Sequence, residues 1–144
     1  MKLTKTQLAA IFSGEIKTYS GIAPSLPATP IVLIVRDSGA GAAEVVQETV
    51  MGGRQISQDA LQLPSQGALL KKLETNKSAI GYISSGLIAG SDKLHPFPFE
   101  GVVPTDQNIL RGDYTLARPL LLVVKEPVGP MAWAMCAGLS QPRA

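Results

Sequence analysis

Apolar residues along this chain follow two spacings, one typical of helices and one typical of buried strands. The first helical stretch covers residues 5–13. Thr4 and Gln7 at its beginning match a capping box, and Gly14 can adopt the left-handed conformation that ends a helix. The apolar face of this stretch consists of Leu8, Ile11 and Phe12. The pattern therefore predicts a helix over residues 5–13.

A strand and a second helix are predicted next. Residues 15–30 contain three prolines and are typical of a connecting loop. Residues 31–35 are an unbroken run of β-branched and apolar side chains, which suits a strand buried on both faces of a parallel sheet. After a turn of small residues, helical spacing returns over residues 42–50, and Gly52 and Gly53 end it.

The same alternation continues to the end of the chain. Helical spacing predicts a helix over residues 65–75, and residues 79–83 are typical of a short strand. Residues 94–99 contain two prolines, so we expect an edge strand or an irregular segment there. Three further elements are predicted. They are a short helix through Leu110 that Thr105 caps and Gly112 closes, a strand over residues 116–125, and a final helix that carries Met131, Trp133, Ala134, Met135 and Leu139. Alternating strands and helices predict an α/β fold, a three-layer sandwich with a largely parallel sheet.

Composition and charge narrow the class of protein. At 144 residues and 45% apolar side chains, the chain can form one hydrophobic core. Its 13 basic and 11 acidic residues give a net charge of +2, and only Lys71 and Lys72 are adjacent basic residues, so we expect no nucleic-acid partner. The longest apolar run, residues 120–124, has the length of a strand, so we expect no membrane insertion. The N-terminal residues do not match a signal peptide.

Metal and catalytic motifs are absent from the sequence. Cys136 is the single cysteine, and no group of cysteines and histidines has the spacing of a zinc site, so we expect no metal and no cofactor. His95 is the single histidine, and the Gly-x-Ser-x-Gly motif of many hydrolases does not occur. We expect His95 to lie at the surface or on an edge strand. The sequence favours a protein that is not an enzyme.

The turn after the strand at residues 31–35 carries the candidate chemistry. Glycines let successive backbone N–H groups converge, and the following helix adds the positive end of its dipole. Arg36 offers a planar set of donors that matches phosphate or carboxylate oxygens, and Ser38 can cap the helix or donate its hydroxyl. The candidate ligand-binding residues are Arg36, Ser38, Gly39, Ala40, Gly41 and Ala42. Two interpretations stay open at this point: an anion site, and a plain turn beside a surface arginine.

Nucleotide motifs do not fit this turn. A dinucleotide fingerprint needs a small residue at the position of Glu44, whose charge would repel a pyrophosphate. The Gly-Lys-Ser/Thr of a nucleotide P-loop is also missing. A nucleotide-dependent enzyme is therefore the least favoured hypothesis.

Residues 36–42, Arg-Asp-Ser-Gly-Ala-Gly-Ala, resemble the Arg-x-x-Gly-Ser-Gly-Thr anion loop of the phosphate-binding proteins of ABC uptake systems. Segments with the order and character of that family flank the loop: residues 3–14, 79–83, 101–109 and 114–120. The similarity extends over nearly the whole chain. The four ordered segments make coincidence a poor explanation.

This resemblance implies one lobe of a class II periplasmic-binding-protein fold, with residues 1–144 forming the second lobe only. It implies phosphate or a similar small oxyanion as the ligand, a first lobe that has no counterpart here, an ABC permease as a possible partner, and a periplasmic or extracytoplasmic location. Ala40 and Ala42 replace the serine and threonine of the family loop, so two hydroxyl donors are missing. The alternative is a sensory or interaction domain of the same fold whose anion site is relaxed or lost.

Four residues outside the loop have two interpretations each. Arg118, in the last family-like segment, can line the cleft or pair with an acidic side chain. Tyr82, Ser84 and Ser85 follow a predicted strand and could face the ligand, although turn formation explains them more simply.

Overall fold

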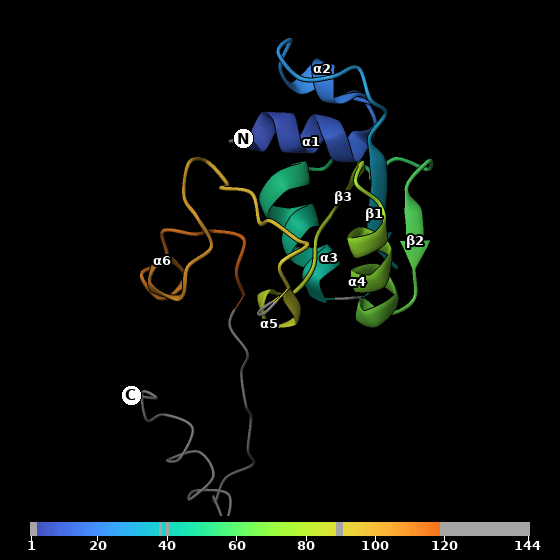
Figure 1. Cartoon of the computed structure of the whole chain (residues 1–144). Coiled ribbons are helices and arrows are strands. Elements are labelled where there is room, and N and C mark those ends of the chain that lie inside the picture. Colours follow the sequence, from blue (N-terminus) through green and yellow to red (C-terminus); the bar gives the residue numbers. More distant parts are fainter. Residues whose placement is uncertain (1–2, 38, 40, 89–90, 119–144) are drawn as a thin grey trace, which may run out of the picture.

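The computed structural model describes residues 3–37, 39, 41–88 and 91–118 (Figure 1). Its centre is a sheet of three parallel strands in the order β2-β1-β3: β1 (Val32–Arg36), β2 (Leu61–Leu63) and β3 (Ala79–Gly81). Two of these confirm predicted strands, although β1 begins one residue later than expected and β3 is shorter. Strand β2 was not predicted.

Strand β1 is buried because it has a strand on each side and helices on each face. Leu33, Ile34 and Val35 are 8%, 0% and 1% exposed. Neighbouring side chains of a strand point to opposite faces, and Leu33 and Val35 belong to one core cluster with Phe12 and Met51. This is the environment that the unbroken apolar run predicts.

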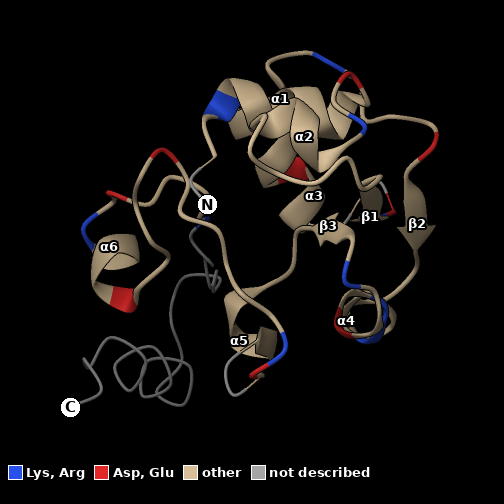
Figure 2. Ribbon diagram, turned by 45° about the horizontal axis from the view of Figure 1, so that its top comes forward, with Lys and Arg blue, Asp and Glu red and all other residues tan. Residues whose placement is uncertain are grey.

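Helices lie on both faces of the sheet, as Figure 2 shows. Helix α4 (Gln66–Thr75) packs on one face and contacts all three strands. On the other face lie α1 (Lys5–Ser13), α3 (Gly41–Val46) and the π-helix η1 (Gln47–Met51) that continues α3. The architecture is therefore the predicted one, an α/β fold with three layers and a parallel sheet.

The ends of α1 follow the sequence signals closely. Thr4 Oγ1 accepts a hydrogen bond from the Gln7 N–H at 3.2 Å, and Gln7 Oε1 accepts one from the Thr4 N–H at 3.1 Å. Gly14 ends the helix in the left-handed conformation, with φ of 82°. The predicted helix over residues 5–13 is confirmed, since local hydrogen bonds fix both ends.

Other helices agree with the sequence less completely. The helix expected over residues 42–50 begins at Gly41 and changes to π-helical geometry at Gln47 before Gly52 ends it. Helix α4 confirms the prediction for residues 65–75, and Ser65 caps its first turn. A single helical turn, α2 (Tyr19–Ile22), lies inside the segment that was expected to be only loop, and its four residues are too few to show a period.

The C-terminal part of the described chain holds two short helices, α5 (Ser85–Ile88) and α6 (Asp106–Leu110). Thr105 caps α6 as predicted. Residues 94–99 are irregular, and Phe99 forms isolated bridges to Leu3 and Val102. Of the predicted strand over residues 116–125, the described residues 116–118 are not in a strand. The rest of that strand, and the final helix with Trp133 and Cys136, lie outside the described residues.

None of the helices in the described ranges is long and apolar enough to cross a membrane.

Candidate functional site

Strand β1 places Arg36 at the edge of the sheet where its parallel strands end. Gly39 follows in a conformation with φ of 114°, which side chains rarely tolerate, and α3 begins at Gly41. The predicted succession of strand, glycine turn and helix is therefore present. In open α/β sheets, ligands bind at this carboxyl edge.

The backbone and side chain of Arg36 are held from two directions. Its Nε donates to Asp37 Oδ1 at 3.0 Å, and its side chain is 16% exposed. The Tyr82 hydroxyl donates to the Arg36 carbonyl at 3.4 Å. Burial raises the pKa of Tyr82, so its hydroxyl keeps the proton that it donates. The Tyr82 ring also lies against Phe12, with 5.8 Å between ring centroids.

The structure brings together four of the six predicted site residues. Arg36, Gly39, Gly41 and Ala42 lie in one short stretch at the carboxyl edge, and Gly41 and Ala42 form the first turn of α3. N–H groups in the first turn of a helix have no acceptor within the helix. Ser38 and Ala40 lie outside the described residues.

An ion pair from a distant segment lies against this turn. Arg118 Nη1 donates to Glu44 Oε2 at 3.0 Å, and the two side chains are 51% and 61% exposed. A Cβ placed on Gly41 would lie 2.1 Å from the same Nη1 and 2.9 Å from Arg118 Cζ. The guanidinium therefore packs directly on Gly41. Of the two roles that the sequence leaves open for Arg118, pairing with an acidic side chain is confirmed.

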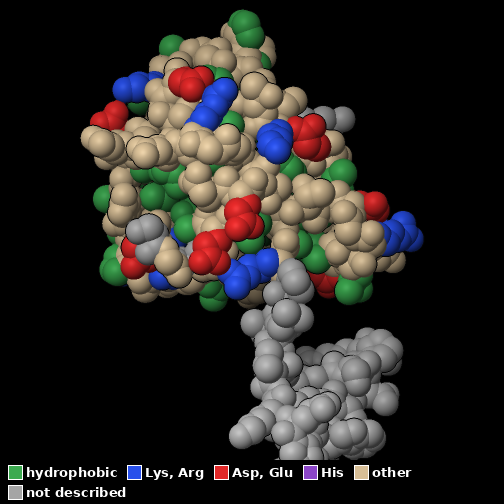
Figure 3. Space-filling model, turned by 180° about the vertical axis from the view of Figure 1, so that it is seen from behind, with side chains coloured by type: hydrophobic (Ala, Val, Ile, Leu, Met, Phe, Trp, Pro, Cys, Tyr) green, Lys and Arg blue, Asp and Glu red, His purple; other side chains and the backbone are tan. Residues whose placement is uncertain are grey.

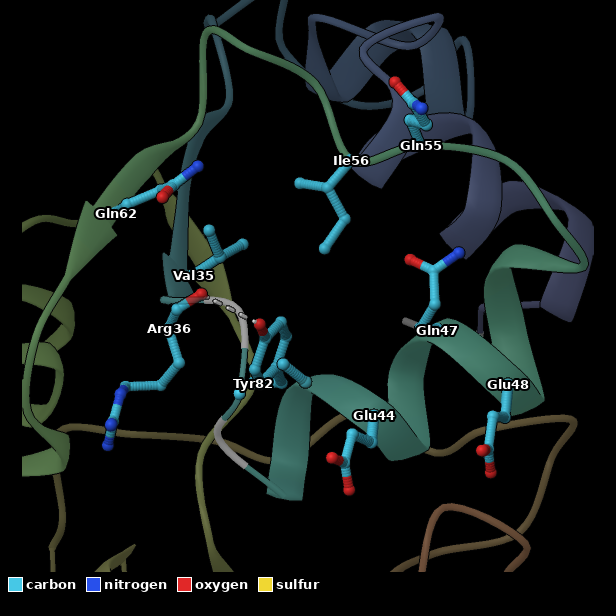
Figure 4. Close-up of a pocket in the computed structure, with 11 residues that line it drawn as sticks. Val35, Arg36, Glu44, Gln47, Glu48, Gln55, Ile56, Gln62 and Tyr82 are labelled. Atoms are coloured by element: carbon cyan, nitrogen blue, oxygen red, sulfur yellow. Dashed lines mark hydrogen bonds between the residues drawn. The ribbon is translucent and has the colours of Figure 1, made fainter.

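A cavity of about 420 Å³ opens beside the end of β1 (Figure 4). Its lining combines apolar groups with three side-chain amides, Gln47, Gln55 and Gln62, and with three charged residues, Arg36, Glu44 and Glu48. Ile56 points into this space, whereas the Arg36 guanidinium points away from it (Figure 4). Sequence reasoning missed the three glutamines because no motif or spacing links them.

The other residues that the sequence singles out are Ser84, Ser85 and His95. Ser84 Oγ accepts a hydrogen bond from Gln66 Nε2 at 3.2 Å, and Ser85 begins α5. His95 is exposed in an irregular segment, as expected. Among the described residues, no three acidic, histidine or cysteine side chains form a group that could hold a metal ion.

Charges on the face opposite α4 are mixed. Figure 3 shows acidic and basic side chains lying beside one another over this face, and hydrophobic side chains gathered in a hollow. A nucleic-acid footprint needs basic side chains collected on one surface. The distribution on this face does not have that character.

Comparison with known proteins identifies a matching family and several related proteins. A family model described as the PBP superfamily domain matches residues 1–136. The phosphate-binding protein PstS of Staphylococcus haemolyticus is 31% identical over 131 residues, which cover 87% of this chain and 41% of that protein. PstS of Staphylococcus aureus strain USA300 is 28% identical over the same length. The chain thus spans about two fifths of the length of these relatives.

Solved structures share the fold over most of the chain. A protein from Clostridium perfringens described as a phosphate ABC transporter substrate-binding protein, with bound phosphate, superposes with a TM-score of 0.80 at 26% identity. This match covers 94% of the present chain and 55% of the other. An ABC-type phosphate transport receptor from Vibrio cholerae has a TM-score of 0.76 at 24% identity and covers 97% and 58%, which shows the fold alone.

Proposed function

This chain belongs to the PBP superfamily, and we infer that it is one solute-binding lobe that takes phosphate or a similar small oxyanion at residues 36–42. The observation that carries this proposal is the placement of Arg36 and a glycine turn at the carboxyl edge of a parallel sheet. The match to a Clostridium protein solved with bound phosphate supports it.

The chemistry of the turn suits an oxyanion. The guanidinium of Arg36 presents N–H donors in one plane, and the first N–H groups of α3 have no helical acceptor. Each hydrogen bond to a charged group contributes about 1.5 to 3 kcal/mol, so Arg36 with two or three backbone donors gives roughly 5 to 10 kcal/mol. Association costs on the order of 4 to 15 kcal/mol. A single lobe with Ala40 and Ala42 in place of hydroxyl donors therefore binds weakly.

A second lobe completes the proposed site. The chain spans only about two fifths of its PstS relatives, and the family resemblance implies a first lobe that supplies the other half of the ligand shell. We expect the whole protein to be extracytoplasmic and to deliver its ligand to an ABC permease. The role is binding and not catalysis. A sensory or interaction domain is less favoured, because the relatives of this chain are phosphate-binding proteins.

Titration followed by nuclear magnetic resonance tests this function. Adding millimolar phosphate, sulfate or molybdate should shift the amide resonances of residues 38–43, while added chloride should not. Replacing Arg36 by methionine should abolish most of the shift, because it removes the charged donor. If none of the three oxyanions shifts these amides, the proposed function is wrong.

A further inference from the structure

We propose that Arg118 is a second guanidinium of the anion site, held on the glycine turn by Glu44. This assignment rests on the proposed function, which itself requires only the turn and Arg36. It extends the site to a residue that lies 74 positions beyond Glu44 in the sequence. The ligand class is the same small oxyanion.

The contacts of Arg118 place its charge at the turn. Its Nη1 lies 2.1 Å from the position that a Cβ on Gly41 would occupy, so only a glycine leaves room for the guanidinium there. Gly41 is also the residue at which α3 begins. An oxyanion that reaches the N–H groups at this point meets the guanidinium of Arg118 as well.

The charges around the turn favour a second cation beside Arg36. Glu44 lies in the first turn of α3, where its carboxylate repels an incoming anion. Asp37, bonded to Arg36 Nε, adds a second negative charge beside the turn. With Arg36 as the single cation, Arg36, Asp37 and Glu44 would leave one net negative charge at the turn. Arg118 brings this sum to zero, so that the turn no longer carries a net charge that repels an anion.

The Glu44 contact leaves capacity for a ligand. A guanidinium has five N–H donors, and the contact to Glu44 is made through Nη1. The side chain is 51% exposed, so solvent and solutes reach it. Ala40 and Ala42 lack the hydroxyls of the family loop, and the planar donors of Arg118 offer a replacement for those hydrogen bonds.

A matched ion pair elsewhere provides the control. Arg54 Nη1 donates to Glu15 Oε1 at 3.1 Å, and the two side chains are 47% and 61% exposed. This pair repeats the chemistry and exposure of the Arg118 pair. Glu15 lies two residues before Lys17. The Lys17 carbonyl accepts a hydrogen bond from the N–H of Ile31, which is the residue just before β1. The control pair therefore lies near the opposite end of β1 from the glycine turn.

The test measures inorganic phosphate affinity by amide shifts in the full chain and its variants. Arg118→Met should weaken binding at least tenfold, and Arg118→Lys should weaken it less, because lysine keeps the charge but loses the planar donors. Arg54→Met, which removes the same charge from the control pair, should bind within twofold of the unsubstituted chain. Glu44→Gln should bind at least as tightly as that chain.

The double variant separates a direct role from simple neutralisation. If Arg118 contacts the anion, Arg118→Met combined with Glu44→Gln should stay at least fivefold weaker than Glu44→Gln alone. Equal affinity of those two proteins would overturn the assignment, because Arg118 would then only mask Glu44. So would an Arg118→Met chain that binds within twofold of the unsubstituted one while Arg36→Met does not bind.

A failure of the proposed oxyanion binding itself gives a different experimental result. If the unsubstituted chain shows no oxyanion-dependent shift, the proposed function falls and the assignment of Arg118 falls with it. If Arg118→Met fails to fold, its amide resonances lose their dispersion. The Arg118→Lys variant then tests the assignment. An affinity of Arg118→Lys equal to that of the unsubstituted chain would then count against the planar contact.

Discussion

Replacing Gly81 by alanine should destabilise the sheet next to the candidate site. Gly81 is the last residue of β3 and pairs with Ile34 of β1. A Cβ at this position would lie 2.4 Å from the Ile34 carbonyl oxygen and 3.3 Å from Leu73 Cδ2. The first of these atoms belongs to the backbone of the central strand, so it cannot rotate away.

The expected loss follows from that distance. Real Cβ atoms essentially never approach other atoms closer than 3.0 Å, so β1 and β3 would have to separate by about 0.6 Å. A ladder hydrogen bond of about 2.9 Å would then lie near the 3.5 Å at which it is largely lost. One or two weakened bonds at about 0.5 to 1.5 kcal/mol each, together with overpacking against Leu73, predict a loss of about 1 to 3 kcal/mol.

Urea unfolding of the full chain, followed by circular dichroism, measures this loss. With a denaturant slope of about 1 to 3 kcal/mol per molar urea, the unfolding midpoint of Gly81→Ala should fall by about 1 M. Gly67→Ala is the matched control, because Gly67 lies in α4 and an added Cβ meets nothing within 4 Å. The control should be neutral or more stable, since alanine favours a helix. If both variants unfold at the same urea concentration, the reasoning about the β1–β3 contact is wrong.

Three further changes have defined outcomes. Thr4→Ala should lower the free energy of unfolding by about 1 kcal/mol, because it removes the capping box of α1. Stability should fall as the pH rises above about 10, because burial raises the pKa of Tyr82 and Tyr114 above the usual value of a tyrosine. The folded chain therefore holds those protons more tightly than the unfolded chain does. Gly41→Ala should push the Arg118 guanidinium off the turn and weaken phosphate binding several-fold.

Each of these changes has a contrasting measurement. Thr6→Ala, on the exposed side of the same helix, should not destabilise the chain, and equal losses at both positions would contradict the capping argument. Replacing Tyr82 by phenylalanine should reduce the loss of stability at alkaline pH, and an unchanged alkaline unfolding curve would contradict the pKa argument. Gly41→Ala should have no further effect in an Arg118→Met chain if it acts through that side chain.

The parts of the fold that the sequence predicts well are those fixed by neighbouring residues. The ends of α1 depend on hydrogen bonds between Thr4 and Gln7 and on the left-handed Gly14. The central strand of the sheet is an apolar run, which is stable where both of its faces are buried. Similarly, Arg36 and the glycines form the candidate turn within a few residues of sequence.

Contacts between distant segments could not be predicted in the same way. Strand β2 is three residues long, with two exposed side chains, and exists because Ile34, Val35 and Arg36 offer it a parallel partner. The ion pair of Glu44 and Arg118 joins residues 74 positions apart, so only the fold brings it to the turn. The four-residue helix α2 has the same origin, because one turn carries too little pattern to stand out from a proline-rich loop.

Anomalous scattering from molybdate bound to crystals of the chain tests the central claim most directly, because it locates the oxyanion without reference to any variant. We expect a molybdenum peak within hydrogen-bonding reach of the Gly41 and Ala42 N–H groups, on the side of the Arg36 guanidinium. A peak found only at Lys71 and Lys72, or none at the glycine turn at saturating molybdate, would contradict it.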